Sequence, residues 1–227
     1  MNDTSILVLS CDAYEDLWEP FFTLKSRYWN CDYKTYIATE TKLCEYAIAL
    51  RHNYPISQWT TRIRKSLEEI PTKYVIVMCD DFFIRKKVRT DIIENCIYEM
   101  KDDIACFSFE QEYAPTLLSK FFGFRLKPQN SEYLNTCQAT LWDREKLIER
   151  LQDEQNPWEW EEAKVNSPYK HFVSLYDGEW IIDYGHDYFG KWSGVCKGKW
   201  VREDVVPLFE KENIEVDFSV RGFTDET

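Results

Sequence analysis

The fold class of this chain follows from one stretch, Tyr74-Val-Ile-Val-Met-Cys-Asp-Asp-Phe-Phe83. Five apolar residues and a cysteine are followed there by two adjacent carboxylates. A continuous apolar run is typical of a β-strand that is buried on both faces of a sheet. Asp80 and Asp81 would be costly inside a core, so we expect them at the carboxyl end of the strand, where ligands bind in open α/β sheets. The stretch predicts an acidic site for a divalent cation that holds a phosphate.

The segments around this strand alternate between two periodicities. Apolar runs predict strands over residues 6–10, 33–39, 74–79 and 104–109, and apolar residues at three- and four-residue steps predict helices over 16–28, 55–70 and 86–100. This order predicts an α/β fold, with a mainly parallel sheet between two layers of helices.

The second half of the chain is less regular. Residues 111–135 combine proline, glycine and basic residues without a period, which indicates a loop-rich insertion or a lid. Short strands are predicted over 138–142, 171–176 and 179–184, and helices over 143–151, 157–162 and 202–212. Because there is no repeat and no flexible linker, we expect one domain over residues 1–227, with halves at 1–110 and 111–227.

Composition narrows the classes of partner. The 227 residues are 44% hydrophobic, enough for a substantial core, and 16% aromatic with nine Trp, which suits either an aromatic core or a cleft that stacks bases or sugars. The net charge of -12 argues against nucleic acid as the main partner, because phosphate backbones are bound by clustered Lys and Arg. A single nucleotide needs only a few local donors.

Cysteine spacing and hydropathy bear on the compartment. The eight cysteines include no CxxC pair and no zinc spacing, so we expect reduced thiols in a cytoplasmic protein. The N-terminus lacks the basic and long apolar regions of a signal peptide, and no apolar run approaches the roughly 18 residues of a membrane span. Surface aromatics could still dock the protein at the inner face of a membrane.

Six short stretches together resemble a known family. In chain order they are Ser10-Cys-Asp-Ala-Tyr-Glu-Asp-Leu-Trp18, Trp59-Thr-Thr-Arg62, Asp80-Asp-Phe-Phe83, Gln138-Ala-Thr-Leu-Trp142, Asn156-Pro-Trp-Glu-Trp-Glu161 and Gly198-Lys-Trp200. Their combination resembles bacterial GT-A type glycosyltransferases, which build capsule, exopolysaccharide and other surface glycans. The resemblance implies a GT-A-like three-layer α/β/α sandwich, with a nucleotide-sugar-binding half over 1–110 and an acceptor-binding half over 111–227.

The implied metal is Mn²⁺ or Mg²⁺, bound to the leaving diphosphate. The usual motif of the family is Asp-x-Asp, but Cys79 occupies the position of its first acid. Asp81 is the first choice as metal ligand, Asp80 would contact the metal or the ribose, and the resemblance suggests His186 as an additional ligand. The alternatives are that the two acids cap a helix and that His186 is structural.

The general base is expected between two glutamates. Glu159 and Glu161 face different directions whether their segment is extended or helical, so only one should reach the pocket. The resemblance favours Glu161, and burial beside Trp158 and Trp160 would raise its pKa towards a value that suits a base. Alternatively, the acids form a solvated turn, or the Trp rings stack on the acceptor sugar.

Polar residues at the ends of the first two strands are predicted to bind the donor nucleotide. Asp12 and Tyr14 would recognise base and ribose, although Asp12 could instead cap the next helix. Thr39 and Glu40 end the second strand at the same edge of the sheet.

A helix and a late basic segment add candidate contacts to the diphosphate. Trp59 and Arg62 share one helix face, from which Arg62 could bind phosphate, pair with Asp80 or remain solvated. Lys191 and Lys199 lie in an aromatic, basic segment that suits either the diphosphate or an anionic, lipid-linked acceptor.

The sequence therefore predicts a hexosyltransferase-like enzyme. It would move a sugar from a nucleoside diphosphate, UDP in preference to GDP, to a saccharide or lipid-linked saccharide, with inversion by a Glu base. One alternative is a non-catalytic carbohydrate- or nucleotide-binding protein on the same fold, suggested by Cys79. A nucleotidyltransferase is disfavoured, because the loop Cys11-Asp-Ala-Tyr-Glu15 is acidic and has no glycine.

Overall fold

A computed structural model describes residues 3–112, 120–121, 123–129, 131, 133–151, 153–175, 179–185 and 194–224. The chain clusters into two compact units, which we describe separately. Unit 1 comprises Met1–Asp12, Asp32–Cys79 and Arg89–Ile181, and unit 2 comprises Ala13–Cys31, Asp80–Val88 and Ile182–Thr227. The single domain expected over residues 1–227 stays a prediction.

Unit 1 is built on one sheet, whose described strands run in the order β3-β2-β1-β4-β8-β5-β9-β7-β6. The strands are β1 (Thr4–Leu9), β2 (Lys34–Thr39), β3 (Ile48–Arg51), β4 (Tyr74–Cys79), β5 (Ile104–Glu112), β6 (Lys120–Phe121), β7 (Phe124–Leu126), β8 (Thr140–Asp143) and β9 (Lys170–Leu175). The first four pair in parallel, as do β5 and β9, whereas β8 is antiparallel to both β4 and β5. The predicted mainly parallel α/β sheet is confirmed.

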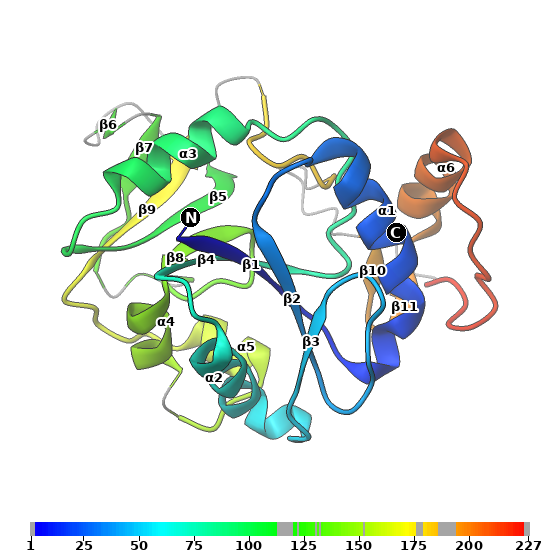
Figure 1. Ribbon diagram of the computed structural model, residues 1–227, viewed down its shortest axis with the longest axis horizontal. Helices are drawn as coiled ribbons and strands as arrows, with labels where there is room; N and C mark the ends of the chain where they lie inside the picture. Colours follow the sequence, from blue (N-terminus) through cyan, green and yellow to red (C-terminus); the bar gives the residue numbers. More distant parts are fainter. Residues whose placement is uncertain are drawn as a thin grey trace. The chain divides into compact units, whose positions relative to one another are not determined.

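Helices cover both faces of this sheet. They are α2 (Trp59–Glu69), preceded by the 3-10 turn η2 (Ile56–Gln58), then α3 (Thr90–Glu99), α4 (Arg144–Arg150) and α5 (Pro157–Glu162). Figure 1 shows α2, α4 and α5 on one face and α3 on the other. The carboxylate of Asp143 accepts a hydrogen bond from the Lys146 N–H at 3.2 Å, which confirms the predicted cap of α4. Unit 1 therefore has the three layers that the sequence predicted.

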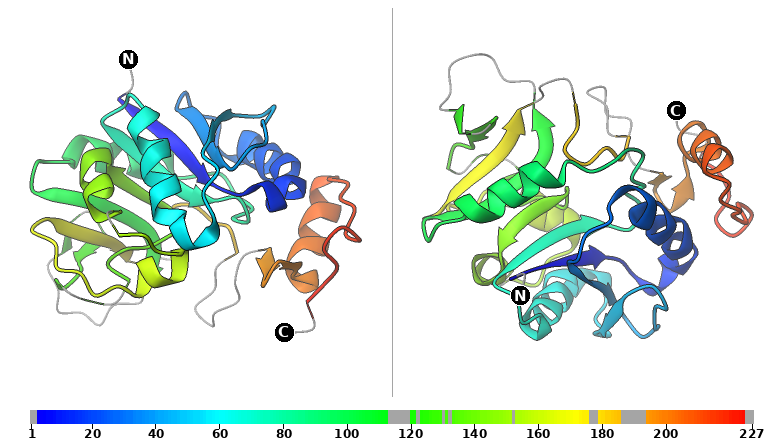
Figure 2. Two further views of the ribbon diagram at one scale, coloured as in Figure 1. Left: turned by 90° about the horizontal axis from the view of Figure 1, so that it is seen from below. Right: turned by 45° about the horizontal axis from the view of Figure 1, so that its top comes forward.

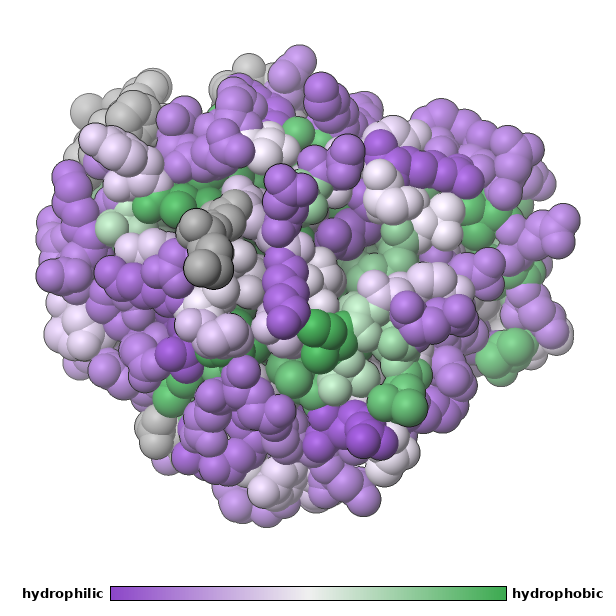
Figure 3. Space-filling view, viewed as in Figure 1, coloured by the Kyte–Doolittle hydropathy of each residue, from purple (hydrophilic) through white to green (hydrophobic). Residues whose placement is uncertain are grey.

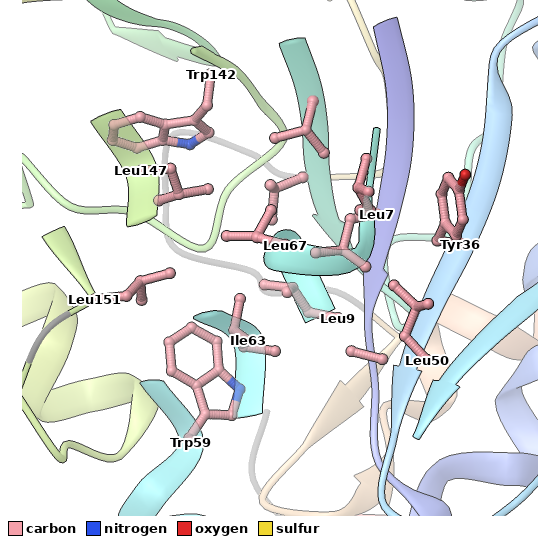
Figure 4. Close-up of a cluster of buried hydrophobic side chains, with 14 of the residues drawn as sticks. Leu7, Leu9, Tyr36, Leu50, Trp59, Ile63, Leu67, Trp142, Leu147 and Leu151 are labelled. Atoms are coloured by element: carbon pink, nitrogen blue, oxygen red, sulfur yellow. The ribbon is translucent and has the colours of Figure 1, made fainter. Parts of the chain in front are cut away.

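The face that carries α2, α4 and α5 contains the main hydrophobic cluster (Figure 4). Alternate residues of the strands, such as Leu7 and Leu9 in β1, point towards Ile63 and Leu67 of α2. Trp142 of β8 is completely buried in the same cluster. Each buried side chain of this size contributes roughly 1.5–3 kcal/mol relative to exposure. This packing fixes the carboxyl ends of β1, β2 and β4 relative to α2.

The sheet edge formed by β3 was not predicted. Among the described strands it pairs with β2 alone, and Ile48 in the strand, Leu43 before it and Ile56 after it are exposed. Figure 3 shows apolar side chains at the surface over this strand, on an otherwise mainly hydrophilic face. With just four residues, β3 is too short to show a period of its own.

Unit 2 contains the 3-10 segment η1 (Asp12–Leu17, from Ala13 on), α1 (Trp18–Tyr28), the hairpin β10 (Val195–Cys196) and β11 (Lys199–Trp200), and α6 (Arg202–Glu212). Figure 2 shows the hairpin leading into α6. The centre of unit 2 is aromatic. The centroid of the Phe83 ring lies 6.1 Å from that of Trp200 and 5.1 Å from that of Phe209. The Tyr28 hydroxyl donates to Glu212 at 2.6 Å, which ties α1 to α6.

Two predictions about secondary structure were wrong. Residues 179–185 form no strand. The Asp183 carbonyl oxygen accepts from the Arg85 N–H at 2.7 Å, so this part of the backbone is hydrogen-bonded to a loop and not to a neighbouring strand. The helix expected from residue 86 begins at Thr90. Within the loop-rich segment over 111–135, the described residues also include the short hairpin of β6 and β7, whose strands of two and three residues are too short to give a pattern.

Candidate functional site

The acidic stretch begins where β4 ends. Cys79 is the last residue of the strand, and the chain then enters unit 2 at Asp80. Asp80 is buried, with 5% of its surface exposed, and Asp81 is half-buried. Within unit 2, the Phe82 ring stacks on Tyr184 with centroids 4.4 Å apart, and the Gly194 N–H donates to Asp81 O at 3.3 Å. The backbone of Asp81 and the ring of Phe82 are therefore each held by a contact within unit 2.

Arg221 places a positive charge within electrostatic range of Asp80, and sequence reasoning missed it. Its Nε donates to Asp16 Oδ2 at 2.8 Å, and its guanidinium lies 4.6 Å from the centroid of the Tyr14 ring. Burial lowers the pKa of Arg221, but the charges of Asp16, Tyr14 and Asp80 outweigh it and raise that pKa. Tyr14, predicted to stack on a base, thus has a guanidinium against its ring. Arg221 lies in a tail segment without periodicity, so no sequence signal marked it.

The donor atoms after β4 suit a hard cation only in part. Asp80 and Asp81 supply carboxylate oxygens, and one or two carboxylates with phosphates and water are enough for Mg²⁺. Among the described residues, no group of three or more His, Cys, Asp or Glu side chains could hold a metal. Cys79 supplies a soft thiol, which donates a hydrogen bond to the Cys137 carbonyl oxygen at a sulfur–oxygen distance of 3.6 Å. His186, predicted as a further ligand, lies outside the described residues.

In unit 1, Asp12 organises the loop that follows β2. Its Oδ1 accepts from the N–H groups of Glu40, Thr41 and Lys42, each at 3.1 Å, and its Oδ2 accepts from the Thr41 hydroxyl at 2.5 Å. Burial raises the pKa of Asp12, but the bonds from Thr41 and Lys42 have the larger combined effect and lower it. The Thr39 hydroxyl donates to Lys42 O at 2.9 Å and closes the same loop.

Arg62 joins this loop to α2. Its side chain is 3% exposed and forms an ion pair with Glu40, whose other oxygen accepts from the Asp12 N–H at 2.5 Å. Arg62 is therefore not a solvated surface residue. The structure brings together four predicted binding residues at the carboxyl ends of β1 and β2, namely Asp12, Thr39, Glu40 and Arg62.

Trp59 occupies a different place from the one expected. Its side chain is 5% exposed, and its ring centroid lies 5.6 Å from that of Trp160 in the hydrophobic cluster. The indole therefore packs α2 against α5. A role for Trp59 in binding stays a prediction.

The two candidate bases on α5 have separate environments. Glu159 forms a capping box with Asn156: Asn156 N donates to Glu159 Oε2, and Glu159 N donates to Asn156 Oδ1, both at 2.9 Å. Glu161 instead faces inward, where Oε1 accepts from the Cys137 N–H at 2.6 Å. Burial raises the pKa of Glu161, and the nearby charge of Glu110 adds to that rise. The predicted divergence of the two glutamates is confirmed.

Glu161 lies close to the end of β4 in unit 1. Cys137 contacts Glu161 through its N–H and Cys79 through its carbonyl oxygen, so a single residue links the base candidate to the strand. Lys127 is buried nearby and lowers the pKa of Glu161 electrostatically. Cys137 and Lys127 were not predicted, since neither lies in a periodic segment.

The late basic segment is described only in part. Lys199 is exposed on β11, and Lys191 lies outside the described residues. Among the described helices, none combines the length and the apolar composition that a membrane crossing requires.

Fold and site together define the class: an α/β protein with a mainly parallel sheet, an acidic loop after a central strand and a half-buried carboxylate, Glu161, beside that strand. No protein family model matches the chain, and no curated protein matches it.

Three solved structures illustrate what the chain is similar to. They are the bifunctional IspDF from Campylobacter jejuni (13% identity, TM-score 0.44, 78% of this chain and 50% of that chain), a cytidylyltransferase from Leptospira borgpetersenii (10%, 0.42, 70% and 68%) and TarS from S. aureus (11%, 0.45, 78% and 36%). The chain spans half or less of IspDF and TarS. At identities this low, the activity has to be inferred from the site itself.

Proposed function

We propose that the chain is a glycosyltransferase. It would move a sugar from a UDP-linked donor to a saccharide or lipid-linked saccharide acceptor, in the synthesis of a surface polysaccharide at the inner face of a membrane. The observation that supports this best is Glu161, a half-buried carboxylate with a raised pKa, held by the Cys137 N–H at 2.6 Å close to the end of β4. A base needs this combination of fixed position and raised pKa.

In the proposed reaction, Glu161 accepts the proton of the acceptor hydroxyl. The hydroxyl oxygen forms a bond to the anomeric carbon while the bond from that carbon to the β-phosphate oxygen breaks, and UDP leaves with the electron pair. Direct displacement of this kind inverts the anomeric configuration. The Cys137 N–H holds Oε1 of Glu161, and we assign the proton transfer to Oε2.

The donor side of the proposal rests on two clusters that are described separately. In unit 1, Asp12 and the ion pair of Glu40 with Arg62 shape the loop after β2, which we assign to the nucleoside. In unit 2, Asp81 with Asp80 would hold Mn²⁺ or Mg²⁺, an ion that would stabilise charge on the leaving diphosphate. Lys199, Lys191 and His186 remain proposed contacts.

The decisive experiment replaces Glu161 with Gln. The amide still accepts from the Cys137 N–H but cannot take a proton, so transfer should fall by about 10²–10⁴-fold while UDP affinity is unchanged. Glu159→Gln is the matched control, because Gln also completes a capping box and this variant should keep wild-type turnover. Release of UDP from a panel of UDP-sugars, with surface-glycan extract as acceptor, measures turnover. Full activity of Glu161→Gln would place the base elsewhere.

A second candidate function follows from Cys79, the thiol in place of a metal-binding acid: a carbohydrate- or nucleotide-binding protein without catalysis. Thermal stability measured with UDP, GDP and CDP, with and without Mn²⁺, separates the two. Stabilisation by UDP that requires Mn²⁺ supports the transferase. Stabilisation by nucleotide with no turnover of any UDP-sugar supports the binding protein.

A further inference from the structure

Two cysteines lie next to each other beside Glu161, at the end of β4. Cys79 ends that strand, and its sulfur lies 3.6 Å from the carbonyl oxygen of Cys137. Both side chains pack against the same hydrophobic cluster, which places them on the same face of the sheet. Both are also half-buried, so small solutes can reach them.

The backbone brings the two residues within reach of a disulfide. Strands β4 and β8 are antiparallel, with Val77 opposite Thr140. Cys79 is two residues beyond Val77, and Cys137 is three residues before Thr140, so continuing the register places Cys79 opposite Gln138, the chain neighbour of Cys137. The Cys79 sulfur lies 3.6 Å from the backbone oxygen of Cys137, and a disulfide joins residues whose Cα atoms are about 4.4–6.8 Å apart.

We propose that Cys79 and Cys137 form a reversible redox site, which closes to a disulfide in the presence of a peroxide. One thiol attacks the O–O bond of hydrogen peroxide, which gives a sulfenic acid and one water. The sulfur of the second thiol then displaces hydroxide from the sulfenic acid, which forms the S–S bond and releases a second water. The two sulfurs lose two electrons in total, and one peroxide is reduced to two waters. A thiol reductant reverses the change.

The position of the pair links its redox state to Glu161. Cys137 hydrogen-bonds Glu161 through its N–H at 2.6 Å and also through its side chain. A disulfide removes the thiol hydrogen of Cys137 and pulls its sulfur towards Cys79, so the oxidised form loses part of what holds Glu161. The redox site itself does not depend on the proposed function.

The other cysteines provide internal comparisons. All eight belong to the part of the chain that the structure describes, and each is a thiol. Cys96 and Cys106 are buried and should react slowly. Cys196 is half-buried, as the pair is, but belongs to β10 of unit 2. If exposure alone decided the reaction with peroxide, Cys196 would therefore be oxidised as readily as Cys79.

The test is peptide mapping of the full chain. Reduced protein is treated with hydrogen peroxide, blocked with N-ethylmaleimide and digested without reductant. We expect one dominant cross-linked peptide that joins Cys79 to Cys137, lighter than its two parts by two hydrogens and lost on treatment with dithiothreitol. Cys196→Ser should give the same cross-link, and Cys137→Ser should give none.

The wild-type map alone can overturn the proposal, so it does not depend on how the variants fold. Recovery of both Cys79 and Cys137 as maleimide adducts after peroxide, while Cys196 is oxidised, would refute it. So would separate oxidation of the two to sulfinic acids without a cross-link. Because the readout is a covalent bond, a failed transferase assay leaves this test unaffected.

Discussion

Replacing Asp12 with asparagine tests how the loop after β2 is held. The Asp12 carboxylate accepts from three successive N–H groups, those of residues 40–42, and from the Thr41 hydroxyl. The amide introduced by Asp12→Asn would keep one oxygen in place, and the Thr41 hydroxyl can turn to accept from the new NH₂ group. The substitution therefore removes the charge and one acceptor, Oδ2, to which the Thr41 N–H also donates at 3.0 Å, while Oδ1 keeps its bonds.

The cost can be worked from these bonds. A hydrogen bond to a charged group contributes about 1.5–3 kcal/mol, and a neutral one about 0.5–1.5 kcal/mol, so each of three N–H bonds weakens by roughly 1 kcal/mol. Asp12 is only half-buried, and solvent reduces this sum. We expect a loss of about 2 kcal/mol in the free energy of unfolding, which corresponds to a Tm lower by roughly 4–8 °C for a chain of this size.

The pH dependence has a definite sign. The pKa of Asp12 is lower in the folded protein than its ordinary value of 3.8, because the bonds from Thr41 and Lys42 outweigh the effect of burial. The folded state thus favours the charged form, and this stability is fully present above pH 3.8 and is lost as the pH falls through the folded value. The difference between wild type and Asp12→Asn should be constant from about pH 7 to 5 and shrink below about pH 4.

Urea unfolding at neutral pH and at about pH 3 measures this difference. Glu45→Gln is the control, because it removes one exposed charge a few residues further along and should change stability by less than about 0.5 kcal/mol. Equal stability of wild type and Asp12→Asn at neutral pH, or a difference that ignores pH, would refute the role of the carboxylate. If the affinity for UDP falls by far more than the loss of loop stability accounts for, Asp12 contacts the base directly.

Two other perturbations test the interior of each unit. Burial, together with the charges of Arg150 and Lys127, lowers the pKa of His171 to about 3, so the unfolded chain takes up a proton below pH 6.5 that the folded chain does not. Stability should therefore fall by about 1.4 kcal/mol per pH unit between about pH 6 and pH 4, and urea titrations of His171→Gln should lack this slope; equal slopes would contradict it. In unit 2, Gly194→Ala places a methyl group into the ring of Phe83 and should cost about 1–3 kcal/mol by thermal unfolding. Adding Phe83→Leu should recover part of that loss, and additive costs would show that the two do not clash.

The environment of Glu161 shows how far sequence reasoning reached at the site. The spacing of Glu159 and Glu161 already required that only one of them face inward, since residues two apart on a helix point in different directions. Which of the two does so depends on Asn156, which binds Glu159, and on Cys137, which meets Glu161 from a segment 24 residues away. The second contact is a matter of tertiary folding, and local pattern could not reveal it.

The sequence by itself determined the α/β class, the parallel strands β1, β2, β4 and β5, and the acidic stretch after β4, because burial imposes apolar runs and helical periods that are visible locally. The tertiary structure alone decided the antiparallel place of β8 between β4 and β5, the approach of Arg221 to Tyr14 and the meeting of Cys79 with Cys137. Each of these joins residues that are far apart in the chain. Packing and charge in the folded state decide which residues meet. The local periodicity around either residue carries no information about that contact.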